Sequence, residues 1–303
     1  MTRKTEIKIG PHTLEISNPD KILFPRDGIT KGDLIDYYTK IAEVIIPHMK
    51  DRPLNMDRFP SGIDKKDFFQ QSIPEGYPEW AGRITVPRKE GGEVTHIVCE
   101  DSATLAYMAN LACITPHIWL SRSDSLNSPD KMIFDLDPEE GFSQARSAAF
   151  RIKDLMEDIG LVAFVMTTGS RGLHVVVPLD RSEEFDSVRS FARTVSEVLA
   201  RRYPEEMTVE QHKDQRGGRL FLDTARNSYG QTSVAPYSVR AKDWAPVATP
   251  LHWDELEDRK LNARSYSMSN IFRLLNERPD PWKEIYSHSQ SLKKASLKLK
   301  DTV

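Results

Sequence analysis

Two carboxylates stand two residues apart at the end of a strand-like run in the middle of the chain. The motif IFDLDP at residues 133–138 places Asp135 and Asp137 after apolar residues that favour strands. Side chains at positions i and i+2 of a strand point to the same face of a sheet. A third acid, Asp223, ends a second strand-like run, RLFLD, at residues 219–223. Because hard divalent cations prefer carboxylate oxygens, the three acids indicate a site for one or two metal ions.

A glycine turn with polar side chains follows the first two acids along the chain. Its sequence is TGSRGLH at residues 168–174, and it groups the hydroxyl of Ser170, the guanidinium of Arg171 and the imidazole of His174. Such a turn is suited to binding an anion, for example a triphosphate. Residues 210–242 then carry six basic against three acidic side chains. Three acids beside a basic region are typical of enzymes that transfer phosphoryl or nucleotidyl groups with two metal ions.

Each of these features also has a purely structural interpretation. An aspartate at a strand end can cap a helix or lie on the surface, and His174 can be a buried, hydrogen-bonded histidine. A basic strip can be no more than a solvated charged face. The metal interpretation is favoured for the acids because all three end strands that are predicted to share one sheet.

The composition limits the class of protein. The chain has 303 residues, 29% of them charged and 39% hydrophobic, which fits a folded protein of one large domain or two lobes. No apolar run is long enough to span a bilayer, and no secretory signal is visible at the N-terminus. Two cysteines give neither a disulfide framework nor zinc-ligand spacing. We expect a cytoplasmic protein without a membrane partner. The formal net charge of −3 also argues against a surface coated in positive charge.

From residue 131 the hydrophobic pattern follows the order β-α-β-β-α-β. The predicted strands are residues 131–136, 161–167, 173–179 and 220–223, and the predicted helices are residues 143–159 and 185–199. This order predicts an α+β fold with a ferredoxin-like, split βαβ core. In the usual strand order of that fold, 4-1-3-2, the fourth strand lies beside the first. The fold therefore predicts that Asp223 lies next to Asp135 and Asp137.

The preceding residues predict an additional N-terminal α/β lobe. Thr30 is expected to cap a helix that runs to about residue 46 and ends at Pro47, and residues 102–112 predict a second helix. We therefore expect a single module with three parts: the N-terminal lobe at 1–130, the catalytic core at 131–286 and a basic, weakly ordered tail at 287–303.

Taken together, the motifs resemble a known family. It is the polymerase domain of bacterial and archaeal ligase D, the end-joining branch of the archaeo-eukaryotic primase superfamily. The resemblance runs from about residue 17 to 286. It rests on an ordered set of motifs: NPDK at 18–21, RP at 52–53 with Arg58 and PSG at 60–62, KDFFQ at 66–70, HIW at 117–119, FDLDP at 134–138, GSRGLH at 169–174, FLDTARN at 221–227, PYSVR at 236–240 and PVATPL at 246–251.

The resemblance implies a metal-dependent nucleotidyltransferase with a primase-type core. Such an enzyme extends DNA 3′ ends with NTPs, preferring ribonucleotides, during gap filling and end processing in non-homologous end joining. Asp135, Asp137 and Asp223 are implied as catalytic residues and as ligands of two divalent ions, Mn²⁺ or Mg²⁺, with Mn²⁺ favoured. The implied nucleotide contacts are His117, Ser170, Arg171, His174, Arg216, Arg226, Arg240 and Lys242. The implied contacts to DNA and its 5′-phosphate are Asn18, Lys21, Lys31, Arg52, Phe68 and Phe69.

The implied partners are DNA ends and gapped duplex with a 5′-phosphate, NTPs, a separate ATP-dependent DNA ligase and a Ku-type end-binding protein. The location would be the nucleoid of a prokaryote. Without the resemblance, Phe68 and Phe69 read as core aromatics, and Lys21 and Lys31 as surface lysines. An exposed phenylalanine pair would instead offer a stacking platform for a templating base.

The chain departs from the family pattern at several positions. Ile118 follows His117 where proline is common, Gln71 and Ser72 replace a basic pair, and Arg171 stands where lysine is frequent. The nucleotidyl-lysine motif Lys-x-Asp-Gly of a ligase is missing, so the chain is expected to be a stand-alone polymerase or an excised domain.

Three other functions stay open at this point. A general primase or primer-extending polymerase would share the same core. A haloacid-dehalogenase-like phosphatase also has Asp-x-Asp after a strand, but it needs a parallel sheet. In a non-catalytic DNA-end-binding module, the acids would bind only a structural ion.

Overall fold

The computed structural model describes residues 4–88 and 90–300. The chain forms two compact units, which we describe one at a time. Unit 1 holds the chain up to Trp119 together with residues 232–247 and 267–272. Unit 2 holds residues 120–231 and 248–266 and the chain from residue 273 on. In the part of the chain that the structure describes, no helix is long and apolar enough to cross a membrane.

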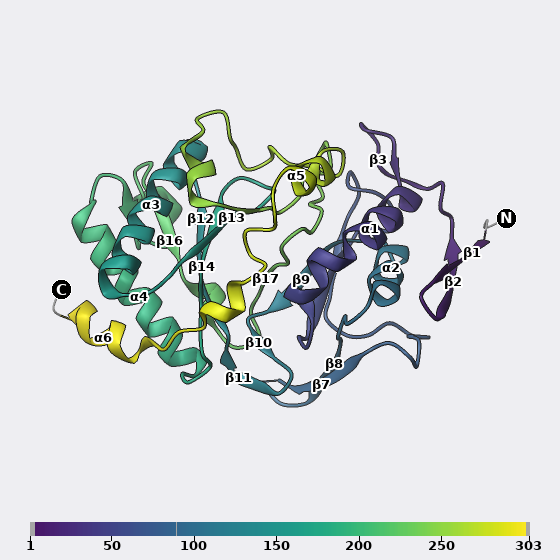
Figure 1. The fold of residues 1–303 in the computed structure, drawn as a ribbon, viewed down its shortest axis with the longest axis horizontal. Coiled ribbons are helices and arrows are strands. Elements are labelled where there is room, and N and C mark those ends of the chain that lie inside the picture. The colour runs from purple at the N-terminus through teal and green to yellow at the C-terminus, as the bar shows by residue number, and fades with distance from the viewer. Residues whose placement is uncertain (1–3, 89, 301–303) are drawn as a thin grey trace. The chain divides into compact units, whose positions relative to one another are not determined.

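Unit 2 is built on a mixed six-stranded sheet with the strand order β15-β16-β12-β14-β13-β18 (Figure 1). The central strands are antiparallel neighbours, and only β15 pairs with β16 in parallel. The inner order β16-β12-β14-β13 confirms the predicted 4-1-3-2 arrangement of a split βαβ core. The strands of this sheet are β12 (Lys131–Asp137), β13 (Phe164–Thr167), β14 (Leu173–Pro178), β15 (Met207–Thr208), β16 (Leu220–Asp223) and β18 (Pro250–Leu251). A separate two-stranded sheet is formed by β10 (Ser121–Arg122) and β11 (Ser125–Pro129).

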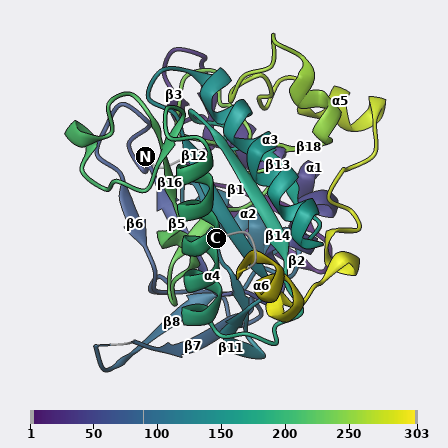
Figure 2. The same cartoon turned by 90° about the vertical axis from the view of Figure 1, so that its left-hand side faces the viewer.

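Helices cover one face of this sheet. Met132, Phe134 and Leu136 alternate along β12 and are fully buried against apolar residues of α3 (Phe142–Ile159) and α4 (Phe185–Arg202). Because side chains alternate along a strand, the other face of β12 carries Asp135 and Asp137. Figure 2 shows α3 and α4 in front of the strands, with α6 (Leu292–Lys300) beside them. Short 3₁₀ turns complete the unit: η1 (Lys213–Gln215), η2 (Ala225–Asn227), η3 (Trp253–Glu257) and η4 (Ile285–His288).

Unit 1 combines a second sheet with two helices. The sheet has the order β17-β9-β5-β8-β7, with β6 also paired to β5. Two-stranded ribbons, β1–β2 and β3–β4, precede it. The elements are β1 (Lys4–Ile9), β2 (His12–Ser17), β3 (Ile22–Phe24), β4 (Ile29–Thr30), α1 (Lys31–Met49), β5 (Leu54–Arg58), β6 (Phe68–Gln70), β7 (Arg83–Pro87), β8 (Glu93–Ile97), α2 (Ser102–Asn110), β9 (Cys113–Trp119) and β17 (Thr232–Val234). Helix α5 (Ile271–Glu277) follows late in the chain.

Helix α1 begins as predicted but ends later. Thr30 accepts a hydrogen bond from the Asp33 amide, and the Asp33 side chain accepts one from the Thr30 amide, which completes the capping box. The prediction that Pro47 ends the helix was wrong. Proline removes one donor in the last turn, yet the helix continues to Met49 because the Lys50 amide still donates to the Ile46 carbonyl.

The division of the chain into units differs from the prediction. We expected one continuous N-terminal lobe that ends at residue 130, and a weakly ordered tail at residues 287–303. Residues 232–247 return to unit 1 because β17 pairs with β9. In the tail, α6 forms because Leu292, Ala295 and Leu299 recur at helical spacing and are buried in the core of unit 2. The last residues of the tail, 301–303, lie outside the described part. Cys99 and Cys113 are free and buried, in agreement with the absence of a disulfide framework.

Candidate active site

Three polar side chains lie side by side across three neighbouring strands of unit 2. Asp135 on β12 is directly opposite His174 on β14, and on its other side it is directly opposite Asp223 on β16. Directly opposed residues of antiparallel strands share a face, so the three side chains occupy one row on the face away from the helices. Asp137 lies on the same face two residues further along β12. The predicted proximity of Asp223 to Asp135 is therefore confirmed.

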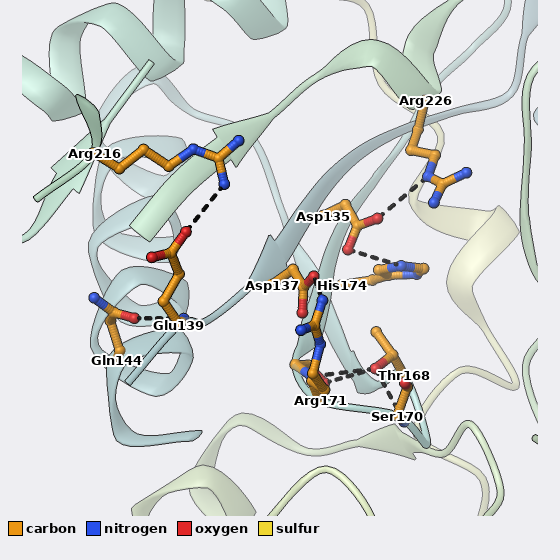
Figure 3. A network of polar contacts seen from close by, with 11 residues as sticks. Asp135, Asp137, Glu139, Gln144, Thr168, Ser170, Arg171, His174, Arg216 and Arg226 are labelled. Carbon is orange, nitrogen blue, oxygen red and sulfur yellow. Dashed lines mark hydrogen bonds and ion pairs between the residues drawn. The ribbon is translucent and has the colours of Figure 1, made fainter. Parts of the chain in front are cut away.

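Asp135 is the buried centre of this row. Its two carboxylate oxygens face two different partners: Oδ1 lies 3.5 Å from His174 Nε2, and Oδ2 lies 3.2 Å from Arg226 Nε (Figure 3). Burial alone would raise the pKa of this carboxyl, but His174 and Arg226 outweigh it and hold the pKa well below its usual range. Asp135 is therefore an anion at any physiological pH. The Nδ1 atom of His174 is buried and has no hydrogen-bond partner in the described part of the chain.

The other two acids are more accessible. Asp137 forms an ion pair with Arg171, which comes from the turn between β13 and β14 (Figure 3). Asp223 is half-buried, and its Oδ1 accepts a hydrogen bond of 2.7 Å from the Ala225 amide. Among residues 4–88 and 90–300, no three His, Cys, Asp or Glu side chains are arranged to hold a metal ion. The carboxylates thus share a face of the sheet, while Asp135 and Asp137 are paired with arginines and a histidine.

The turn that carries Ser170 and Arg171 is closed by Thr168. The Thr168 hydroxyl accepts hydrogen bonds from the Ser170 and Gly172 amides, both at 3.3 Å, and donates to the Gly172 carbonyl at 3.1 Å (Figure 3). Gly172 packs so tightly on β12 that a Cβ atom there would lie 1.7 Å from the Leu136 carbonyl oxygen. From the other side, Arg264 donates to the Ser170 carbonyl at 2.8 Å. The turn is therefore fixed against the strand that carries Asp135 and Asp137.

Two arginines approach the site from the segments around β16. Arg226 lies in η2, and the neighbouring Asn227 is fully buried, accepting from the Ile133 amide at 2.8 Å and donating to the Ile133 carbonyl at 2.7 Å. This pair of hydrogen bonds joins η2 to β12 and holds Arg226 beside Asp135. Arg216 is mostly buried and donates to the Glu210 and Gln211 carbonyls and to Glu139 (Figure 3). Arg216 thus uses two of its side-chain nitrogens for hydrogen bonds within its own loop.

In unit 1, an aromatic pair is exposed next to a histidine. Phe68 and Phe69 on β6 are 44% and 47% exposed, so they are not core residues. The guanidinium of Arg58 lies over the Phe68 ring at 4.8 Å, and the His117 ring meets the Phe69 ring edge-on with centroids 5.3 Å apart. An exposed aromatic pair with a cation against it is a surface on which nucleobases stack.

Also in unit 1, three polar residues flank the β3–β4 ribbon. Asn18 and Lys21 are exposed, and the Lys31 amide donates to the Lys21 carbonyl at 2.8 Å. The Lys31 side chain is buried, and its ammonium donates to Ser17 Oγ at 3.0 Å and to the Asn110 carbonyl at 3.1 Å. Burial, followed by the nearby charge of Lys21, lowers the pKa of Lys31 to about 8. The charge of Lys21 thus reaches the Lys31 ammonium, and two like charges that act on each other in this way are both stabilised by a bound anion.

Arg240 and Lys242 occupy one loop of unit 1. Lys242 is exposed, and its amide donates to the Arg240 carbonyl at 2.8 Å. Arg240 also acts electrostatically on Asp57 of β5. Burial and the charge of Asp67 raise the pKa of Asp57 to about 6, although Arg240 opposes that shift. The structure thus distributes the expected nucleotide contacts over both units, with Ser170, Arg171, His174, Arg216 and Arg226 in unit 2 and His117, Arg240 and Lys242 in unit 1.

Comparisons with known proteins show which family this arrangement represents. Residues 30–282 match the family model described as the LigD primase-polymerase domain. The chain belongs to the LigD primase-polymerase family. It is therefore an enzyme of the polymerase class, a nucleotidyltransferase, and the family resemblance seen in the motifs is confirmed.

The relatives are longer proteins. The multifunctional non-homologous end joining DNA repair protein LigD of Mycobacterium tuberculosis is 38% identical over 262 residues, covering 83% of this chain and 34% of that protein. The bifunctional end joining protein LigD of Bacillus subtilis is 28% identical over 280 residues, covering 91% of this chain and 45% of that protein. The chain thus spans about a third to a half of the length of these relatives.

A solved structure matches both units. The polymerase domain of M. tuberculosis ligase D, solved in complex with DNA, is similar with a TM-score of 0.85 and 32% sequence identity. The match covers 91% of this chain and 99% of that one. It confirms the α+β, primase-type fold class.

One residue assigned to DNA contact departs from the expectation. Arg52 is fully buried in unit 1, where it donates to the His48 carbonyl at 3.1 Å and to the Trp119 carbonyl at 3.4 Å. A guanidinium enclosed by backbone carbonyls has no surface to offer to a phosphate. We therefore regard Arg52 as a core residue that ties the end of α1 to β9.

Several residues that shape the LigD-type site were missed by sequence reasoning. Thr168 and Gly172 close the turn that carries Ser170 and Arg171, Asn227 joins η2 to β12, and Arg264 donates to the Ser170 carbonyl. Thr168 and Gly172 were visible as part of a polar glycine motif, which could have identified them. Nothing in the local sequence marks Arg264, because its partner lies far away along the chain.

Proposed function

We propose that the chain adds nucleotides, ribonucleotides in preference, to DNA 3′ ends at gaps and broken ends that carry a downstream 5′-phosphate. The observation that carries this proposal is the row of Asp223, Asp135 and His174 across three strands, with Asp137 on the same face. Family membership supports the chemistry, since the matching family is a primase-polymerase domain. The related M. tuberculosis polymerase domain, solved in complex with DNA, supports DNA as the substrate.

The carboxylates suit divalent metal ions in donor type, and all three lie on one face of the sheet. Asp135, Asp137 and Asp223 offer oxygen ligands from adjacent positions of β12 and β16, and we propose that they hold two ions, Mn²⁺ in preference to Mg²⁺. Bound there, such ions would supply charge neutralisation for the triphosphate and activation of the attacking 3′-hydroxyl. In this structure Asp135 pairs with Arg226 and His174, and Asp137 pairs with Arg171. The positive charge of the metal ions would take the place of these partners.

The chain's own side chains then have distinct tasks. Arg171 and Arg226, released from the carboxylates, are positioned to hold the phosphates of the incoming nucleotide. We also assign His174, which lies beside Asp135 in the same row, to the nucleotide site. In unit 1, Phe68 and Phe69 offer stacking surface to the templating base, and Lys21, Lys31 and Asn18 offer a site for the downstream 5′-phosphate.

The structure bears on two of the competing functions. A haloacid-dehalogenase-like phosphatase needs a parallel sheet, whereas β12 and β14 are antiparallel neighbours here. A binding module with a structural ion would not need a fixed turn beside the acids, and we propose that the turn at residues 168–172, which Thr168 closes, binds the anionic nucleotide. A general primer-extending polymerase shares the whole site, and the phosphate preference tested below separates it from an end-joining enzyme.

The wider setting follows from the relatives. Each is named for non-homologous end joining, and each is longer than this chain. We propose that the chain works in the prokaryotic cytoplasm at the nucleoid, with an ATP-dependent DNA ligase activity and a Ku-type end-binding protein completing the repair.

Sugar selection provides one test. A site that hydrogen-bonds the ribose 2′-hydroxyl discriminates against a nucleotide lacking it, because polar groups of the site are then left unpaired. Ser170 and His117 are the residues we assign to this role. We expect ribonucleotides to be added at least about tenfold more efficiently than deoxynucleotides, measured as kcat/KM for single additions to a primer with each of Mn²⁺ and Mg²⁺. Equal or better use of deoxynucleotides with both metals would contradict the assignment.

Recognition of the 5′-phosphate gives a second test, with a defined pH dependence. Because the pKa of Lys31 is about 8, its ammonium is present at pH 7 and is lost as the pH rises through 8. A terminal phosphate is fully ionised over this range. We expect binding to a gapped duplex with a 5′-phosphate to weaken between pH 7 and pH 9, and to depend on Lys31 far more than binding to the hydroxyl-ended duplex does.

The variants are Lys31→Met and Lys21→Met, with Lys40→Met as the matched control. Lys40 is an exposed lysine of the same helix that pairs with Asp36 at 2.6 Å. The double variant should lose at least about tenfold in affinity for the phosphorylated gap at fixed salt, as expected for charged hydrogen bonds to phosphate. If the unaltered protein binds both duplexes equally at pH 7, the end-joining role loses its support.

A further inference from the structure

Trp244 is an exposed tryptophan in the loop that also carries Arg240 and Lys242. Its side chain is 63% exposed, whereas Trp119 and Trp282 are 4% and 2% exposed. The loop is closed at its base by a bridge between Val239 and Val247. Tryptophan is on average a highly buried residue, so Trp244 differs in exposure from the two buried tryptophans and offers an accessible ring on a loop with basic residues.

The backbone of this loop is held in a strained conformation. Trp244 and Ala245 both have positive φ values, +70° and +43°, in the left-handed region that bulky side chains avoid. Two hydrogen bonds fix it there: the Trp244 amide donates to Asp27 Oδ2 at 2.7 Å, and the Ala245 amide donates to the Lys242 carbonyl at 3.0 Å. Asparagine or glycine would adopt this geometry at lower cost. Strain of this kind is concentrated at functional positions.

The side chain of Trp244 lies against a cation. The Arg26 guanidinium lies over the indole ring at 5.0 Å, and Arg26 is itself held by an ion pair of 2.8 Å with Asp243. Because the side chain stays 63% exposed, much of the ring surface remains open to solvent. Phe68 and Arg58 form a similar pair elsewhere in unit 1.

The loop is tied to the segment that bears the proposed phosphate site. Arg26 and Asp27, which contact Trp244, lie in the turn between β3 and β4. The two lysines, Lys21 and Lys31, flank this ribbon and are joined by a backbone hydrogen bond of 2.8 Å. Trp244 thus contacts the same small ribbon of unit 1 that Lys21 and Lys31 flank.

We propose that Trp244 is a stacking platform for an unpaired DNA base beside the 5′-phosphorylated end. This inference rests on the proposed function, since it presumes that the chain binds DNA ends. Nucleobases stack on exposed aromatic rings irrespective of sequence, and neighbouring cations hold the backbone of the same strand. Near Trp244, the three basic residues Arg26, Arg240 and Lys242 outnumber the two acids Asp27 and Asp243, which favours a nucleic acid over an apolar protein surface.

The test compares Trp244→Asn and Trp244→Tyr with the unaltered protein. Asparagine removes the ring and suits the left-handed backbone, so the thermal midpoint should be unchanged or raised. The DNA is a duplex with a 5′-phosphate and a single-stranded overhang, and a second version carries abasic residues throughout the overhang. Affinities are measured by fluorescence anisotropy at one salt concentration.

We expect Trp244→Asn to bind the overhang DNA about tenfold more weakly and Trp244→Tyr to bind it nearly normally. The unaltered protein should bind the abasic DNA about tenfold more weakly than the base-containing DNA. On the abasic DNA, Trp244→Asn and Trp244→Tyr should have the same affinity. Equal binding of the base-containing DNA by Trp244→Asn and the unaltered protein would overturn the inference and leave the proposed function intact. A similar loss on both DNAs would also overturn it, because it would indicate a purely structural role. Failure of the unaltered protein to bind either DNA would instead count against the proposed function.

Discussion

Replacing Asp135 or Asp137 by alanine is expected to abolish nucleotide addition while leaving the fold intact. Both carboxylates lie on the face of the unit 2 sheet that points away from α3 and α4, and Asp135 is an anion because His174 and Arg226 hold its pKa low. Without either acid, the metal ions that would position the triphosphate lose a ligand. We expect kcat to fall by about 10²–10³-fold or more in primer extension.

The matched control is Asp124→Ala. Asp124 also pairs with an arginine, Arg181, at 2.7 Å, but on an exposed part of unit 2 outside the row of acids. Asp135→Asn adds a second check, because it keeps the size of the side chain and removes only its charge. Near-normal addition by Asp135→Asn and Asp137→Ala, with normal folding, would refute the assignment of the catalytic acids.

The second large effect is expected for Gly172→Ala, which adds a single methyl group. That group would lie 1.7 Å from the Leu136 carbonyl oxygen and 2.9 Å from Pro138 Cδ, so β12 and the turn at 168–172 cannot keep their separation. We expect the variant to lose about 4 kcal/mol or more of unfolding free energy, measured in urea, and to be inactive.

Gly76→Ala separates this steric effect from backbone strain. Gly76 has a φ of +71° but no heavy atom within 4 Å of an added Cβ, so only conformational strain opposes the change. The expected cost is about 1–2 kcal/mol, with activity retained. If the two alanine variants were equally stable, the close approach of the turn to β12 would not be required.

The sequence predicted those parts of the fold that depend on local periodicity. The helices 142–159 and 185–202 were recognised from apolar spacing, and Gly160 supplies the left-handed C-cap. Chain order then placed Asp223 beside Asp135, because a split βαβ core has only one usual strand order. Strand β13 is shorter than predicted and begins at Phe164, since residues 161–163 have no strand partner: Leu161 and Ala163 are buried and Val162 is exposed.

Partners far apart along the chain could not be predicted in this way. Arg52 reads as a surface cation until the backbone carbonyls of His48 and Trp119 are seen around it. Asn227 reads as a loop residue, although the oxygen and the nitrogen of its side-chain amide both form hydrogen bonds with the backbone of β12. The backbone strain at Trp244 cannot be seen in the sequence, because contacts impose the left-handed conformation of a non-glycine residue. At Trp244 the contact is the hydrogen bond to Asp27. Tertiary contacts, and not local preference, decide these roles.

A single-nucleotide gap-filling reaction tests the central claim most directly. The substrate is a duplex with a one-base gap, a 5′-phosphate on the downstream strand and a known templating base, incubated with the unaltered chain, Mn²⁺ and one NTP at a time. We expect addition of one complementary ribonucleotide, abolished by chelation of the metal and reduced when the 5′-phosphate is missing. No addition with Mn²⁺ or Mg²⁺ and any nucleotide, from protein that binds the same DNA, would contradict the account and favour a non-catalytic end-binding module.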